Sequence, residues 1–150
     1  MSAPICYFDT SALVKLYILE AGSSDVADLF GGSERCVCHE LAYVETRAAL
    51  ASALRSKRLD SATHGACVNR FVSDWQTSLS WVRTDYELLL RAAELAEGFA
   101  LRGYDAVHLA SADRLRTVLP ATQFVSFDHA LNRAAKLIGF ILPPFVPLMP

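Results

Sequence analysis

Apolar and polar residues follow two alternating patterns along this chain: short continuous apolar runs, and longer segments in which apolar residues recur every three or four positions. A short run rich in β-branched and aromatic residues is typical of a strand covered on both faces, and the second pattern is typical of an amphipathic helix. The runs predict strands over residues 5–8, 35–38, 79–83 and 123–127, with a short edge strand over 139–142. The periodic segments predict helices over residues 12–21, 24–30, 40–57, 61–77, 85–101, 102–112 and 129–137. This alternation predicts a three-layer α/β/α domain with a mainly parallel central sheet.

The apolar positions of two predicted helices indicate which side faces the core. The helix over residues 40–57 has its apolar stripe at Leu41, Val44, Ala48 and Ala51. The helix over residues 85–101 has its inward face at Leu88, Leu89, Ala92, Leu95 and Phe99. At about 100° per residue, Glu45 lies on the flank of the first stripe. An acid beside a packing face is costly unless another group compensates its charge, so Glu45 is a candidate functional residue.

Length and composition indicate one domain over residues 1–150, with 53% of the residues hydrophobic, above the usual share. Because one small domain buries only part of this apolar surface, we expect another subunit or a protein partner to cover the rest. No apolar run approaches the roughly 18 residues of a membrane span, and the N-terminus lacks the pattern of a signal peptide. We therefore expect no membrane association and a cytoplasmic location. The four cysteines match no common zinc or redox spacing and are expected to be small core residues.

Four acids stand where a parallel sheet would bring them to one edge. Asp9 and Asp128 each follow a predicted strand and precede a helix, and Asp105 falls in the first turn of another helix. Because open parallel sheets collect functional groups at the carboxyl ends of their strands, we expect these three acids and Glu45 to converge there. The structural alternatives are a turn or cap for Asp9 and a cap for Asp105, both common uses of aspartate.

A cluster of carboxylates predicts a metal site. Like charges repel one another and drive the acids to protonate unless a hard divalent cation neutralises them. Ligand sets made only of oxygen favour Mg²⁺ or Mn²⁺ over zinc, and the chemistry they serve best here is metal-assisted hydrolysis of a phosphodiester. The net charge of −2 opposes nonspecific nucleic-acid binding, but without the four acids 14 basic residues face 12 acidic ones, a balance of +2. A metal-loaded site is therefore compatible with a polyanionic substrate.

Polar residues near the acids are candidates for positioning them. Thr10 or Ser11 is expected to cap the helix that follows the first acid. His108 lies one helical turn beyond the third acid, where a hydrogen-bonded packing role is favoured over metal ligation. Asn132 lies one turn beyond the fourth acid and either orients it or lies on the surface.

Each of the four acids lies in a short segment of its own: residues 8–15, 43–50, 104–110 and 126–128. In this order and at these spacings they resemble the PIN domain, most closely the VapC toxins of bacterial toxin–antitoxin pairs, and the resemblance covers nearly the whole chain. It implies a Mg²⁺-dependent endoribonuclease whose catalytic and metal-binding acids are Asp9, Glu45, Asp105 and Asp128.

The same resemblance implies partners. Members of this family are usually homodimers, inhibited by a small antitoxin that inserts a segment into the acidic cleft, so an RNA substrate, a VapB-like antitoxin and a homodimer are expected. The family's hydroxyl position after the first acid matches Thr10 and Ser11, although many PIN domains have asparagine at the second of these places.

Three other functions compete with this one on the sequence alone. A PIN-like fold can be retained as a non-catalytic binding module, although all four acids are present. A phosphatase of the haloacid dehalogenase type also begins with a strand and an aspartate, but it needs a second aspartate where this chain has Ser11. A phosphoacceptor receiver domain needs an acidic pair at the first strand, and here Thr10 follows Asp9.

Overall fold

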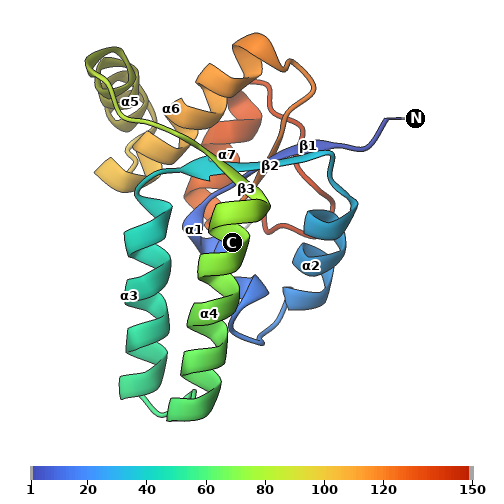
Figure 1. Cartoon of the computed structure of the whole chain (residues 1–150). Helices are drawn as coiled ribbons and strands as arrows, with labels where there is room; N and C mark the ends of the chain where they lie inside the picture. Colours follow the sequence, from blue (N-terminus) through green and yellow to red (C-terminus); the bar gives the residue numbers. More distant parts are fainter. Residues whose placement is uncertain (1, 149–150) are drawn as a thin grey trace.

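The chain folds around one parallel sheet, and its computed structural model describes residues 2–148, so both ends of the predicted 1–150 domain lie outside the described residues (Figure 1). The strands are β1 (Ile5–Phe8), β2 (Arg35–His39), β3 (Leu79–Val82) and β4 (Gln123–Val125). They lie in the order β3-β2-β1-β4, and every pair of neighbours is parallel.

Alternate side chains of the strands belong to two separate cores. In β1, Cys6 and Phe8 lie in one core and Tyr7 lies in the other. The first core is covered by α1 (Thr10–Leu13), the 3₁₀ helix η1 (Val14–Leu16), α2 (Ser23–Gly32), α3 (Ala42–Arg55) and α4 (Ser61–Thr77). The second is covered by α5 (Tyr86–Phe99), α6 (Gly103–Val118) and α7 (His129–Leu137), on the opposite side of the sheet in Figure 1. The predicted three-layer α/β/α arrangement is therefore confirmed.

The first predicted helix ends earlier than its apolar pattern indicates. Helical structure stops at Leu16, at the end of η1, whereas the pattern predicts a helix over residues 12–21. The Ser23 hydroxyl accepts a hydrogen bond from one backbone N–H of the following turn and donates to a carbonyl there, which holds the turn in place. Gly22 closes this turn with φ of 90°, and a Cβ at this position would meet the Phe127 ring at 2.8 Å, so glycine is required.

Tertiary packing selects other inward faces than the predicted ones in α3 and α5. The fully buried positions of α3 are Ala42, Thr46, Leu50 and Ala53. Val44 and Ala48 of the predicted stripe are exposed, because residues 48–51 are all apolar and more than one stripe satisfies the helical period. In α5, Leu88 is buried but Leu89 is 46% exposed, so the prediction for Leu89 is wrong.

Further differences concern α6, which runs to Val118 and not to the predicted end at residue 112, and the edges of the sheet. The predicted edge strand over residues 139–142 is reduced to a single bridge between Gln123 and Ile141. Strand β4 ends at Val125, before the predicted end at residue 127, because Ser126 leaves the sheet and makes side-chain contacts at its carboxyl edge. In residues 2–148, no helix has the length and apolarity to cross a membrane.

Candidate active site

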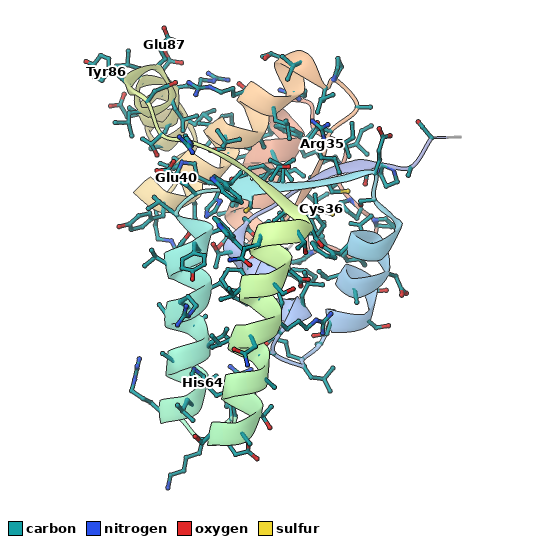
Figure 2. The ribbon with its side chains drawn as sticks, viewed as in Figure 1. Arg35, Cys36, Glu40, His64, Tyr86 and Glu87 are labelled. Atoms are coloured by element: carbon teal, nitrogen blue, oxygen red, sulfur yellow. The ribbon has the colours of Figure 1, made fainter. Side chains whose placement is uncertain are left out.

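The candidate site lies at the carboxyl edge of the sheet. Asp9 follows β1 directly, and Asp128 lies just beyond β4. Glu45 belongs to the first turn of α3, which follows β2, and Asp105 belongs to the first turn of α6. Glu40, labelled in Figure 2, marks this end of β2 at the junction with α3. The topology therefore brings all four predicted acids to one end of the sheet, as parallel strands dictate.

Asp9 is buried, with 3% of its surface exposed. Its Oδ1 accepts hydrogen bonds from the Ser11 hydroxyl at 2.7 Å and from the backbone N–H of Ala12 at 3.0 Å, so Asp9 itself is the N-cap of α1. Its Oδ2 accepts a hydrogen bond from the Ser126 hydroxyl at 2.6 Å. The expectation that Thr10 or Ser11 caps this helix is wrong, because both lie inside its first turn. Asp9 is a helix cap and a buried acid at once.

Burial raises the pKa of Asp9 above its usual value, and the opposing effects of nearby His108 and of the hydrogen bonds do not cancel this shift. No lysine or arginine of residues 2–148 forms an ion pair with Asp9. A buried carboxylate without a cationic side chain beside it is costly in its ionised form. Asp9 therefore favours a bound cation.

Ser126 connects Asp9 to Asp128. Its hydroxyl is fully buried, donates to Oδ2 of Asp9, and accepts from the backbone N–H of Asp128 at 3.0 Å. Asp128 caps α7, since its Oδ1 accepts from the backbone N–H of Leu131 at 2.8 Å. Oδ2 of Asp128 is thereby left for contacts outside the helix.

Arg102 connects Asp128 to Asp105. Its Nε lies 3.0 Å from Oδ2 of Asp105, and its Nη2 lies 3.4 Å from Oδ2 of Asp128. The side chain of Arg102 is 80% exposed, whereas those of the two acids are 20% and 28% exposed. The two carboxylates raise the pKa of Arg102 further, so the guanidinium stays charged.

Glu45 is held by residues of two other elements. Its Oε1 accepts from the Thr10 hydroxyl at 2.8 Å and lies 2.9 Å from Nε2 of His108. The ring of His108 is buried, and its Nδ1 lies 2.9 Å from the Tyr7 hydroxyl. Burial acts to raise the pKa of Glu45, but the hydrogen bond and charge of His108 and the hydrogen bond from Thr10 outweigh it, so the pKa is lowered. His108 is a hydrogen-bonded packing histidine, as expected, and it also orients a candidate acid.

Asn132 does not lie on the surface, and that prediction is wrong. Its side chain is fully buried, and its amide nitrogen donates to the backbone carbonyls of Ser126 and Pro147. Within the described part of the chain, its side chain makes no hydrogen bond to Asp128. Asn132 therefore fixes the backbone that carries Ser126, and acts on the acids only through that residue.

These contacts form one network, but not a preformed metal cage. Ser126 joins Asp9 to Asp128, Arg102 joins Asp128 to Asp105, and Glu45 accepts from Thr10, the residue that follows Asp9 in the chain. Among residues 2–148, no three Asp, Glu, His or Cys side chains lie close enough together to hold a metal ion. The donor type fits a hard divalent cation, since all four are carboxylates and two already contact a cationic guanidinium. Gathering three of them around an ion requires side chains to move.

Three residues of this network were not predicted as site residues: Tyr7, Arg102 and Ser126. The available signals were a serine near the end of a predicted strand, two residues before an acid, and an arginine shortly before an acid at a helix start. Such local patterns are common in proteins. They do not identify the distant partner that gives the residue its role.

Known proteins match this chain in sequence and in structure. The family model of the PIN domain matches residues 6–137. Ribonuclease VapC49 of Mycobacterium tuberculosis (strain ATCC 25618 / H37Rv) is 38% identical over 141 residues, 94% of this chain and 96% of that protein. Ribonuclease VapC35 of the same strain is 29% identical over 134 residues, 89% of this chain and 91% of that protein.

Among solved structures, the fold is similar to the crystal structure of Mycobacterium tuberculosis VapC20, a Sarcin-Ricin loop cleaving toxin. The two structures superpose with a TM-score of 0.64 over 91% of this chain and 96% of that chain, at 16% sequence identity. At this identity the likeness concerns the fold alone.

Proposed function

Because this chain belongs to the PIN domain family, we propose that it is a divalent-metal-dependent endoribonuclease and the toxin of a VapBC-type toxin–antitoxin pair. The observation that carries the proposal is the network at the carboxyl edge of the sheet, in which Ser126 joins Asp9 to Asp128 and Arg102 joins Asp128 to Asp105. The similarity over 94% of the chain to proteins named ribonuclease VapC supports RNA as the substrate.

The residues that would hold the ion are Asp9, Glu45, Asp105 and Asp128. Carboxylate oxygens are the ligands that Mg²⁺ and Mn²⁺ prefer, and a cation beside Asp9 would offset the burial that raises the pKa of this carboxyl. When bound, the ion supplies Lewis-acid polarisation of the phosphate and a water molecule of lowered pKa.

The protein's own residues orient the acids for this chemistry. Ser11 and Ser126 fix both oxygens of Asp9, so this carboxylate cannot rotate freely. Thr10 and His108 both contact Oε1 of Glu45. Locked carboxylates keep a productive geometry without reorganisation during the reaction, which is a main source of catalytic power.

We also propose that residues 1–150 form a single nuclease domain that works as a homodimer and binds a VapB-like antitoxin. Large apolar side chains on the surface support a need for protein partners. Those more than 60% exposed are Leu19, Val44, Tyr86, Tyr104, Val118, Leu137 and Ile141. In Figure 2, Tyr86 and Glu87 at the start of α5 point away from the rest of the molecule.

The family match bears differently on the phosphatase and on the non-catalytic binding module. Membership of the PIN family leaves a haloacid dehalogenase phosphatase without support. A non-catalytic binding module predicts the same fold with no cleavage, so only an activity measurement separates it from the proposed enzyme.

The deciding experiment is RNA cleavage by the purified chain with and without metal. We expect cleavage with Mg²⁺ or Mn²⁺, loss of cleavage in EDTA, and recovery when the ion is restored. Undiminished cleavage in EDTA contradicts the metal-dependent mechanism, and no cleavage of any RNA under these conditions favours the binding module.

The toxin assignment has a separate test in cells. Expression of the wild-type chain is expected to arrest growth, and expression of the Asp9→Asn variant at the same level is expected to leave growth unchanged. Unaffected growth with the wild-type chain, together with cleavage in vitro, would indicate a nuclease that is not a toxin.

A further inference from the structure

Arg102 lies between two of the proposed metal ligands, and we infer that it is an internal cation that occupies their shared space until a divalent ion displaces it. This inference rests on the proposed metal-dependent function. It assigns to Arg102 a role in setting the affinity of the site for metal.

The first argument is that the guanidinium and a metal ion need the same oxygens. Oδ1 of Asp128 already accepts a hydrogen bond from the backbone of α7, so its Oδ2 is the freer oxygen for a ligand, and Arg102 contacts this atom at 3.4 Å. Arg102 also contacts Oδ2 of Asp105 at 3.0 Å. A metal ion and the guanidinium therefore compete directly for both carboxylates.

The second argument is that the guanidinium bridges separate elements. Asp105 lies in the first turn of α6 and Asp128 caps α7, and Arg102 is the side chain that contacts both. Two neighbouring carboxylates repel each other unless a positive charge lies between them. Arg102 supplies that charge in the metal-free protein.

The third argument is that Arg102 can leave at small cost. Its side chain is 80% exposed. Arg102 is the N-cap residue of α6, but its side chain makes no capping hydrogen bond to the helix. Ion pairs of an exposed side chain are weak, because water and salt screen them. Displacement by a divalent ion therefore needs no change in the fold, and replacement of Arg102 leaves the helix start intact.

Arg114 provides a matched control. Its guanidinium makes two contacts of 2.7 and 2.8 Å with the carboxylate of Asp85, the N-cap of α5. Like Arg102, it pairs with an aspartate at a helix start, but that aspartate is not among the proposed ligands. Arg114→Gln and Arg102→Gln remove the same charge, so a difference between them reports the position of the charge.

The experiment is a calorimetric titration of the full-length chain with Mn²⁺, for wild type, Arg102→Gln and Arg114→Gln, at low and at moderate salt. We expect Arg102→Gln to bind Mn²⁺ about 3- to 10-fold more tightly than wild type, the range that its two partly screened ion pairs together can offset. Arg114→Gln is expected to bind as wild type does. The advantage of Arg102→Gln is expected to shrink as salt weakens the pairs in wild type.

Each outcome has a defined meaning. Equal Mn²⁺ affinity of wild type and Arg102→Gln overturns the role of Arg102 and leaves the metal site standing, because binding itself is observed. Weaker binding by Arg102→Gln also overturns it, because Arg102 would then favour metal binding and not compete with it. Equal tightening in Arg102→Gln and Arg114→Gln overturns it too, because the effect would then depend on net charge and not on the position of Arg102. Absence of Mn²⁺ binding in all three proteins overturns both this inference and the proposed metal-dependent function.

Discussion

Nε2 of His108 lies 2.9 Å from Oε1 of Glu45, which joins a histidine of α6 to an acid of α3 across the carboxyl edge of the sheet. The other ring nitrogen lies 2.9 Å from the hydroxyl of Tyr7, in the inner strand β1. A buried side chain with both nitrogens engaged has one orientation, so the position of Glu45 depends on residues in the second core. The site is thus supported by the packing of the sheet and not only by its own loops.

The hydrogen bond between Tyr7 and His108 is expected to couple the two residues energetically. Tyr7→Phe should lower the free energy of unfolding by about 1–2 kcal/mol, because it leaves a buried ring nitrogen without its partner. His108→Leu should lower it by about 2–3 kcal/mol, because it leaves the Tyr7 hydroxyl and Oε1 of Glu45 without their hydrogen-bond partner at His108. The double variant should lose about 1 kcal/mol less than the sum, as measured by urea unfolding.

Tyr17→Phe combined with His108→Leu is the control for this cycle. The Tyr17 hydroxyl donates to Asp74, which is not among the hydrogen-bond partners of His108 in residues 2–148. The two effects should therefore add. Additivity in the Tyr7 cycle as well would show that the hydrogen bond contributes nothing measurable.

Asp9 and Asp128 are expected to be required for cleavage but not for folding. Asp9→Asn and Asp128→Asn should each reduce RNA cleavage by about two orders of magnitude or more, because each removes a metal-directed charge. Asparagine caps helices about as well as aspartate, so both variants should keep the wild-type circular dichroism spectrum.

Asp60→Asn is the matched control for these variants. Asp60 caps α4 through the same kind of bond, at 2.7 Å to the backbone N–H of Thr63, and it is not among the proposed ligands. Its replacement should leave cleavage unchanged. Full cleavage by Asp9→Asn or Asp128→Asn would remove that residue from the site.

The pH dependence of stability should report the buried charge of Asp9. Because burial raises the pKa of Asp9 in the folded protein, its contribution is fully favourable only below the unfolded pKa of about 4 and is lost as pH rises through the folded pKa. In EDTA, Asp9→Asn should therefore gain stability relative to wild type as pH rises from 4 towards 8, measured by urea unfolding.

Asp60→Asn should show the opposite trend. Hydrogen bonds from the backbone and side chain of Thr63 lower the pKa of Asp60, so its contribution is present above the unfolded pKa and is lost as pH falls. The free energy of unfolding of the variant should therefore fall relative to that of wild type as pH rises through the unfolded pKa of about 4. A parallel trend for Asp9→Asn and Asp60→Asn would contradict the buried-charge interpretation of Asp9.

Ser126 is expected to matter for both stability and cleavage. Ser126→Ala leaves Oδ2 of Asp9 and the backbone N–H of Asp128 without their shared partner, which should cost about 2–3 kcal/mol of unfolding free energy. Cleavage should fall because Asp9 is no longer held at both oxygens. Ser56→Ala, which removes only an exposed hydroxyl bonded to a carbonyl of its own helix, should change neither quantity. Wild-type cleavage by Ser126→Ala would show that the hydroxyl does not position Asp9.

Local patterns in the sequence predict the elements and the acids that follow them. Two strand-acid-helix junctions, at Asp9 and Asp128, are visible because a continuous apolar run and an aspartate cap are both local signals. Parallel topology then places both at one edge, so the location of the site follows from the order of elements. The resemblance to the PIN domain, carried by the same segments, is confirmed by the family match over residues 6–137.

Local patterns fail where several solutions satisfy the same period. The alanine-rich face of α3 allows more than one buried stripe, and packing against α4 and the sheet selects Thr46 and Leu50 over Val44 and Ala48. The end of the first helix is likewise decided by the side chain of Ser23, which lies outside the segment whose pattern predicts that helix.

The sequence by itself determined the three-layer fold, the four acids and their order along the chain. Only the tertiary structure decided which residues hold those acids, because the deciding contacts join distant positions: Ser126 and Asp9 are 117 residues apart, and Tyr7 and His108 are 101 apart. A hydrogen bond depends on distance and angle in space and not on separation along the chain. The same holds for Arg102, whose pairing with Asp128 exists only because α6 and α7 meet at the edge of one sheet.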